Sequence, residues 1–297
     1  MLLIIAGSSD GAVDEICKKL KNNVFRLNYD LLKEYEIFFK NSFWSIKNPA
    51  GHEINSDKVT SCFWWKAFFS PPPYEDNFIN EELKYLSREI YNWCQLKGKN
   101  KGNPPDFHNR LGKLNILNIA KDFFKVPDTY YVLGKNSLDK LKETSNDFIT
   151  KSLSSASTNE KANLLTTQVK LETLHPSYPW LLQAKIDSNA DVTVFVCEEK
   201  YFGYARDRTN LKGLDWRGEQ TFDVNVKEWD KLELSIEQVK SIKNFCKALN
   251  VSWGRIDFML VDSALVFLEF NANGQWFFLD YFNNDGIVDS VVNYLYP

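Results

Sequence analysis

The apolar and polar positions at the start of the chain predict an α/β unit. Residues 2–6 form an apolar run of strand length, and residues 7–11 form a glycine-containing turn. Residues 14–21 then have the pattern of a helix, and residues 24–27 that of a second strand. This order is typical of a parallel α/β unit. The turn lacks the Lys-Ser/Thr ending of a phosphate-binding loop, so no nucleotide site is expected there.

Further along, the pattern predicts one long helix and then a strand-rich region. Residues 78–96 indicate an amphipathic helix, and the basic and proline-rich residues after it suggest a domain boundary near residue 105. The later strand-length runs are residues 180–186, 192–196 and 201–205. A helix is expected over residues 235–249 with Ser235 as its N-cap. The polar stretch at residues 152–161 lacks apolar anchors and is expected to be a mobile loop.

The most informative pattern is a predicted β-hairpin within residues 254–271, with its turn at Asp262-Ser263-Ala264. Glu269 and Asn271 lie two positions apart on one strand, so they face the same side. Asp257 on the partner strand can reach that side as well. Two carboxylates and an amide oxygen are hard oxygen ligands, which suit magnesium and phosphate-bearing substrates.

An alternative for these three residues is that the acids end strands and simply face water. The stretch around them is the most apolar of the chain, and charges in such surroundings are costly unless they are paired or bound to a metal. The residues alone leave both interpretations open.

Composition narrows the class of protein. The chain has 297 residues, more than one domain usually needs, with 44% hydrophobic and 15% aromatic residues. A net charge of -3 gives no general attraction to nucleic acid or anionic membranes. The five cysteines form no Cys-x-x-Cys pair and are typical of reduced thiols, and no run has the length of a membrane span. We therefore expect a cytoplasmic protein that binds neither nucleic acid nor membrane.

Several motifs, spread over nearly the whole chain, resemble those of one family. The most specific is Glu269-Phe270-Asn271-Ala272-Asn273-Gly274-Gln275-Trp276. The others are Arg26-Leu27-Asn28, Phe63-Trp64-Trp65-Lys66, the stretch from Asn109 to Thr129, Gln183-Ala184-Lys185-Ile186 and Asp215-Trp216-Arg217. Together they resemble the ATP-grasp ligases, and within them the branch that matures ribosomally made peptides, the graspetide synthetases similar to the microviridin ligases.

The resemblance implies an α+β fold of the ATP-grasp type in three parts. Residues 1–105 would be an N-terminal α/β pre-ATP-grasp domain. Residues 106–185 would be the central subdomain, with the lid over ATP and the binding site for a leader peptide. Residues 186–297 would be the C-terminal subdomain with the magnesium and phosphate site.

The same resemblance assigns roles to individual residues. The metal ligands would be Asp257, Glu269 and Asn271. The groups expected to contact ATP are Lys151 and either Arg110 or Lys113 on the phosphates, Gln183, Ala184, Lys185 and Ile186 around adenine, and Asp191 on the ribose. Taken without the resemblance, Lys151 would be read as an ordinary exposed lysine.

One departure from the family pattern concerns a phosphate-binding arginine, which is replaced here by Thr193. A threonine cannot supply that charge, so another arginine has to. The candidates are Arg206, Arg208, Arg217 and Arg255. Of these we favour Arg206 and Arg217, and we expect catalytic roles for Arg206, Arg217 and Arg255. Because the metal triad is intact, an active enzyme is expected.

The function that the resemblance implies is ATP- and Mg2+-dependent activation of a side-chain carboxylate in a precursor peptide that consists of leader and core. A Ser/Thr hydroxyl or a Lys amine of the same peptide would then close an ester or amide ring, and the enzyme would be a homodimer. The alternatives are a ligase that adds free amino acids and a catalytically silent subunit that escorts a peptide. Three tryptophans, Trp64, Trp65 and Trp180, could line a peptide groove or pack in the core.

Overall fold

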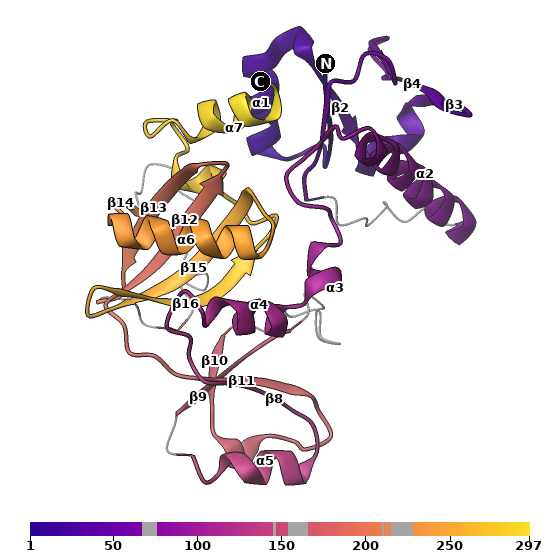
Figure 1. Cartoon of the computed structure of the whole chain (residues 1–297). Coiled ribbons are helices and arrows are strands. Elements are labelled where there is room, and N and C mark those ends of the chain that lie inside the picture. The colour runs from indigo at the N-terminus through magenta and orange to yellow at the C-terminus, as the bar shows by residue number, and fades with distance from the viewer. Residues whose placement is uncertain (67–75, 145–146, 154–165, 210, 212, 215–227) are drawn as a thin grey trace.

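In the computed structural model, the described elements form four sheets arranged in three parts (Figure 1). The residues described are 1–66, 76–144, 147–153, 166–209, 211, 213–214 and 228–297. The predicted mobile loop at residues 152–161 lies outside this set from residue 154 onward.

The N-terminal part is built on a parallel sheet with the order β2-β1-β6-β7. Its strands are β1 (Leu2–Ala6), β2 (Val24–Asn28), β6 (Ser61–Trp64) and β7 (Asn100–Lys101). Helix α1 (Gly11–Leu20) packs with Leu2 and Ile4, whereas α2 (Asn77–Leu96) packs on the face of Leu3 and Ile5. Both faces are covered, which explains why the first strand is apolar throughout. The predicted α/β unit is confirmed.

A small antiparallel sheet with the order β3-β4-β5 extends this part. Its strands are β3 (Glu36–Lys40), β4 (Phe43–Lys47) and β5 (Glu53–Asn55), and the short helices η1 (Lys21–Asn23) and η2 (Tyr29–Glu34) precede it. Trp44 and Ile46 of β4 are fully buried in the core that also contains the α2 residues Ile90 and Cys94. Trp64 and Trp65 are buried too, so both pack in the core rather than line an open groove.

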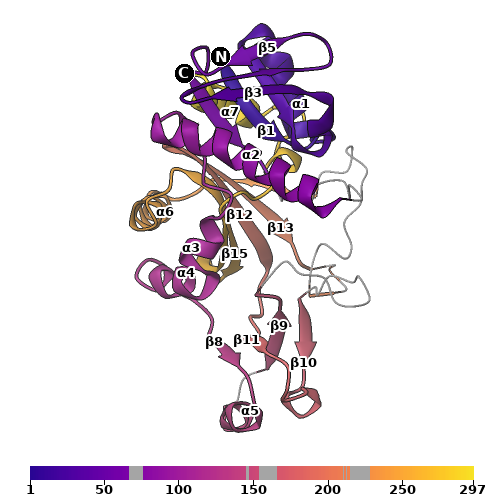
Figure 2. The ribbon, with the colours of Figure 1, turned by 90° about the vertical axis from the view of Figure 1, so that its right-hand side faces the viewer.

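The middle part is a five-stranded antiparallel sheet with the order β14-β13-β12-β15-β16. Its strands are β12 (Ala190–Cys197), β13 (Lys200–Asp207), β14 (Asp230–Leu232), β15 (Trp253–Val261) and β16 (Ala264–Asn271). Helices α6 (Ile236–Ala248), α3 (Phe107–Leu111) and α4 (Lys113–Ala120) cover one face (Figure 2). Ser235 caps α6 in a capping box with Gln238, as predicted for the N-cap.

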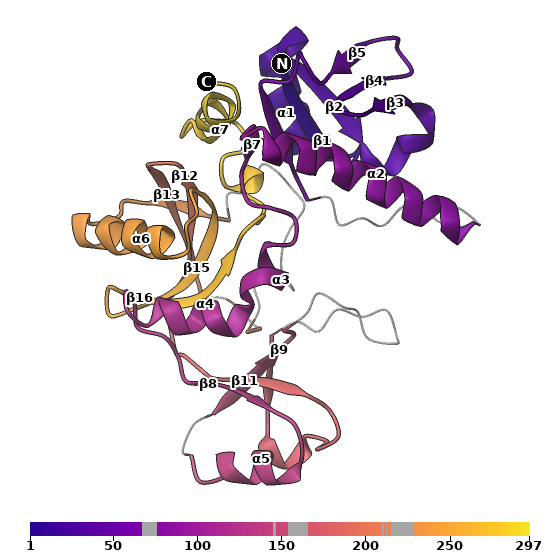
Figure 3. The same ribbon diagram turned by 45° about the vertical axis from the view of Figure 1, so that its right-hand side comes forward.

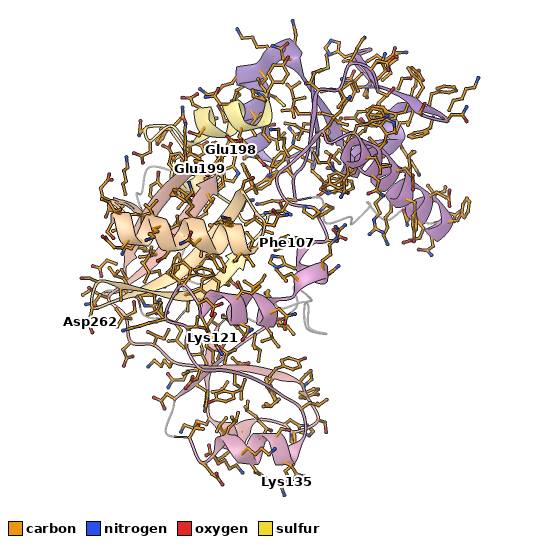
Figure 4. The ribbon with its side chains drawn as sticks, viewed as in Figure 1. Phe107, Lys121, Lys135, Glu198, Glu199 and Asp262 are labelled. Carbon is orange, nitrogen blue, oxygen red and sulfur yellow. The ribbon has the colours of Figure 1, made fainter. Side chains whose placement is uncertain are left out.

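The other face of this sheet meets the N-terminal part at one end. Trp253 and Phe195 pack with Phe63 and Trp65, and helix α7 (Ile287–Leu295) lies beside α1. The turn at Glu198 and Glu199 is close to α7, and Asp262 marks the opposite end of the sheet (Figure 4). The first and last segments of the chain therefore share one core, with η5 (Phe277–Leu279) at its edge.

The third part is a four-stranded antiparallel sheet with the order β10-β9-β11-β8 (Figure 3). Its elements are β8 (Thr129–Val132), α5 (Lys135–Leu141), β9 (Phe148–Lys151), β10 (Thr167–Val169), η3 (Leu171–Thr173) and β11 (Trp180–Ala184). It has a small core of its own that includes Phe148 and Leu182. Among the described helices, none combines the length and the apolar content that crossing a bilayer requires.

Candidate active site

The predicted metal ligands meet on the hairpin of β15 and β16. Asp257 lies directly opposite Glu269 in the strand register, and Arg255 lies opposite Asn271. Directly paired residues point to the same face, so these four side chains gather on one side of the sheet. The Nδ2 of Asn271 donates to Asp257 Oδ2 at 2.7 Å and to Glu269 Oε1 at 3.1 Å. The sequence prediction that these three residues come together is confirmed.

The donor set of this triad fits a hard divalent cation. It offers two carboxylates and one amide, and oxygen ligands of this kind suit Mg2+. Burial would raise the pKa of Glu269, but Lys151, Asn271, Lys113 and Arg255 outweigh it and lower that pKa below its usual range. The Glu269 carboxylate is therefore held in its charged, ligand-ready form. Among the described residues no group of three His, Cys, Asp or Glu side chains forms a rival metal site.

Two lysines approach the triad from neighbouring elements. Lys113 at the start of α4 and Lys151 at the end of β9 line a pocket that also contains Glu269. Arg110 does not line this pocket. Its Nε binds Asp106 at 2.8 Å, and its side chain is 58% exposed. Of the two alternatives for the first phosphate contact, the geometry therefore favours Lys113.

This difference predicts unequal effects for two substitutions. Lys113→Met is expected to raise the KM for ATP about tenfold or more, because it removes a charge-assisted contact to a phosphate. Arg110→Met removes only an exposed ion pair, which contributes about 0–1 kcal/mol, and should leave the KM nearly unchanged. Steady-state ATP turnover by both variants measures the contrast. Equal effects would show that Lys113 does not contact the nucleotide.

The segment expected to hold adenine connects the two antiparallel sheets. Gln183 is fully buried, and its Nε2 donates to Thr129 Oγ1 at 2.8 Å. The backbone N–H groups of Ala184 and Lys185 donate to carbonyl groups of the protein, those of Asp128 and Asp147. Ile186 follows directly. A bound adenine would therefore be held by other groups of this segment, and its assignment stays a prediction.

Asp191, expected at the ribose, lies on β12 on the same face as the triad. Both of its oxygens accept from Arg208 Nη1 at 2.8 Å, and the pair is largely buried. Burial raises the pKa of Asp191, and the nearby Arg208 offsets only part of that rise. The Asp191 carboxylate thus already has a strong protein partner, and its contact with ribose stays a prediction.

The candidate arginines differ in their distance from the triad. Arg206 lies opposite Asp191 in the register and binds Glu228 at 3.2 Å. Arg255 Nη2 binds Asp257 Oδ2 at 3.1 Å, directly at the triad. Arg217, which was also expected here, lies outside the described residues. Thr193, at the position of the missing arginine, donates through Oγ1 to Asp257 Oδ1 at 2.8 Å. Among these candidates, Arg255 is in direct contact with a proposed metal ligand.

Two supporting residues escaped the sequence analysis. Asn103 is buried, and its Nδ2 donates to the carbonyl oxygens of Trp253 and Ala272 at 2.7 and 2.8 Å. His108 Nε2 accepts from the backbone N–H of Ala272 at 3.4 Å. Both residues hold the backbone of Ala272, next to Asn271, in place. They are separated from Ala272 by 169 and 164 positions in the sequence. No local pattern could have pointed to them.

Comparisons with known proteins identify the fold. No protein-family model and no curated protein sequence matches this chain. Among solved structures, it is similar to an ATP-grasp ligase associated with ribosomally made, modified peptides from Chryseobacterium gregarium, in complex with ADP and with leader and core peptides. The TM-score is 0.79 at 20% identity, covering 99% of this chain and 96% of that one.

Two further solved structures are similar to this chain over nearly its whole length. The macrocyclase MdnC from Microcystis aeruginosa, bound to its precursor peptide MdnA, has a TM-score of 0.79 at 17% identity, with 99% of both chains covered. The ATP-grasp ligase PsnB, in complex with a variant precursor, Mg and ADP, has a TM-score of 0.73 at 14% identity, covering 99% of this chain and 97% of that one. Over nearly its whole length, the chain has the ATP-grasp fold in the form found in ligases of ribosomal peptide maturation.

Proposed function

We propose that this protein is an ATP-dependent peptide maturase. It would activate Asp or Glu side chains of a ribosomally made precursor peptide and close ω-ester or ω-amide rings with Ser/Thr or Lys side chains. The observation that carries the proposal is the convergence of Asp257, Glu269 and Asn271 with Lys113 and Lys151. It is supported by the fold, since structures similar to this chain hold ADP, Mg and precursor peptides.

ATP would lie between the two antiparallel sheets. Lys113 and Lys151 would contact its phosphates, and the segment from Gln183 to Ile186 would hold adenine, with Asp191 near the ribose. Mg2+ at Asp257, Glu269 and Asn271 would neutralise charge on the phosphates. We infer the domain division that was expected from the sequence. The nucleotide would bind between residues 106–185 and residues 186–297, and the leader peptide would bind to residues 106–185.

The chemistry needs positioning and charge more than a protein nucleophile. A carboxylate oxygen of the peptide attacks the γ-phosphorus, the bond to ADP breaks, and an acyl phosphate forms. A hydroxyl or amine of the same peptide then attacks the acyl carbon, inorganic phosphate leaves, and one proton is released. Arg255 borders the site of the first step, where its charge can orient the anionic groups. Arg206 and Arg217 are the other arginines that we assign to this role.

The lack of an arginine at position 193 would favour the alternative of a silent escort subunit. Thr193 is hydrogen-bonded to Asp257, and Arg255 contributes a positive charge to the same carboxylate. The site thus has a cation although the arginine at position 193 is missing, which supports an active enzyme. A homodimer in the cytoplasm is the assembly and location that we infer from the resemblance.

The test is the intact mass of a short precursor peptide, sought among the genes next to this one, after co-expression with the protein. We expect the loss of one or more water masses, and Glu269→Ala should abolish that loss. A gain in mass would instead identify a ligase that adds residues. A bound but unchanged peptide would show that the protein is an escort.

A further inference from the structure

A second group of charged side chains lies where the N-terminal sheet meets the triad. Lys66 follows β6, at the carboxyl end of the parallel sheet, next to the turn after β1. This end of a parallel sheet is the usual place for ligands in open α/β units. The residues after β6 lie beside those after β16, because the rings of Trp65 and Trp276 pack with their centroids 6.4 Å apart.

Lys66 is a half-buried cation that forms no ion pair with any residue the structure describes. Its Nζ lies 5.1 Å from the centroid of the Trp65 ring, and no described carboxylate is within ion-pairing distance of it. Burial lowers the pKa of Lys66 to about 8, Asp10 opposes this shift, and the charge of Arg255 adds to it. The backbone of Lys66 has a φ of +47°, which is uncommon for a residue with a side chain. The fold thus keeps the Lys66 ammonium group partly out of water, where its positive charge is less stable than in solvent.

The nearby carboxylate of Asp10 accepts hydrogen bonds from groups other than Lys66. Its Oδ1 accepts from the N–H groups of Ala12 and Val13 as the N-cap of α1. Its Oδ2 accepts from the indole N–H of Trp65 at 3.0 Å. Asp10 therefore moderates the field at Lys66 without pairing with it.

The second cation of this group is Arg255. Its Nη1 donates to the Gln275 carbonyl at 2.9 Å, and its Nη2 contacts Asp257, whose carboxylate also accepts from Thr193 and Asn271. Arg255 therefore shares the Asp257 carboxylate with two other donors. The charge of Arg255 is shared with Asp257, whereas no described carboxylate pairs with Lys66, so Lys66 adds a positive charge beside this ion pair that an anion could balance.

We propose that Lys66 and Arg255 form the subsite that holds the peptide side-chain carboxylate before phosphorylation. This proposal rests on the proposed function and adds a residue of the N-terminal part to it. The carboxylate must lie next to the γ-phosphate. Arg255 contacts the proposed metal ligand Asp257 and the carbonyl of Gln275, and the next residue, Trp276, packs against Trp65 beside Lys66. Two cations at this point hold one anion close to another, which would otherwise repel it.

The test is a binding cycle that does not depend on turnover. The probe is the precursor peptide with a fluorescein label at its N-terminus, either unchanged or with the ring-forming acid replaced by its amide. Fluorescence anisotropy with ADP and Mg2+ measures the affinity of both forms for the full-length protein. We expect the wild type to bind the amide form about tenfold more weakly, since a charge-assisted pair is lost, and Lys66→Met to bind both forms equally.

Two further variants separate this role from a structural one. Lys66→Arg keeps the charge and should retain most of the preference for the acid. Lys101→Met is the matched control, because Lys101 lies on the neighbouring strand β7 with its Nζ 5.1 Å from the Tyr294 ring. It should behave like the wild type. If Lys66→Met still binds the acid form more tightly than the amide form, the subsite is wrong. The proposed function would still stand in that case if the wild type closes rings in the precursor peptide. A wild type that neither binds nor changes the peptide would overturn both.

Discussion

Replacing Asp257 by Asn is expected to reduce peptide-dependent ATP turnover by about 10²- to 10³-fold or more, the range typical for loss of one preorganised charge-stabilising group. Asp257 accepts from Arg255, Asn271 and Thr193 at distances of 2.7 to 3.1 Å. The substitution keeps the shape of the side chain and removes its charge, so both Mg2+ binding and the position of Arg255 should suffer. Initial rates of ADP release with precursor peptide measure the loss.

The matched control lies on the same hairpin. Asp262 is in the exposed turn between β15 and β16, with a φ of +48° that asparagine also tolerates. Asp262→Asn therefore makes the same chemical change at the far end of the same strands and should leave turnover unchanged. A wild-type rate in Asp257→Asn would exclude Asp257 from the metal site.

The predictable part of this protein is the part that rests on short-range periodicity. The strand period of two placed Glu269 and Asn271 on one face, and the register of β15 and β16 brings Asp257 to them. The N-cap at Ser235 followed from the capping preference of serine, and the buried strand β1 from its apolar run. The ATP-grasp fold was expected from the order of motifs and is confirmed by the structural comparisons.

What the sequence could not provide are contacts between distant segments. Asn103 reaches Ala272 across 169 positions, and the choice between Arg110 and Lys113 depends on which side of a short helix faces the triad. The lack of an ion pair between Lys66 and any described carboxylate is likewise a property of the folded chain. The sequence motif shows an aromatic and basic run, but not which acids lie near it in the fold. The sheet of β3, β4 and β5 was also missed.

The second large effect is a loss of stability, expected on substitution of Gly254, which packs against Phe270 and Asn271. Gly254 has a φ of +140°, a conformation almost confined to glycine. A Cβ there would lie 2.5 Å from the ring of Phe270 and 3.2 Å from the carbonyl oxygen of Asn271. Phe270 is buried in the core under α6, so its ring has little room to move. Gly254→Ala is expected to lower the stability of the protein by about 3 to 5 kcal/mol through strain and overpacking.

The comparison that isolates the clash is Gly51→Ala. Gly51 also has a positive φ, of +83°, but no atom lies within 4 Å of a Cβ placed on it, so its substitution should cost only about 1 to 2 kcal/mol of backbone strain. Thermal unfolding of both variants gives the difference. Because the clash falls on Phe270 and Asn271, Gly254→Ala should also weaken Mg2+-dependent turnover at temperatures where it is still folded, whereas Gly51→Ala should not. Equal Tm values for the two variants would mean that β15 and β16 can separate at this point, and that the triad does not depend on close packing behind it.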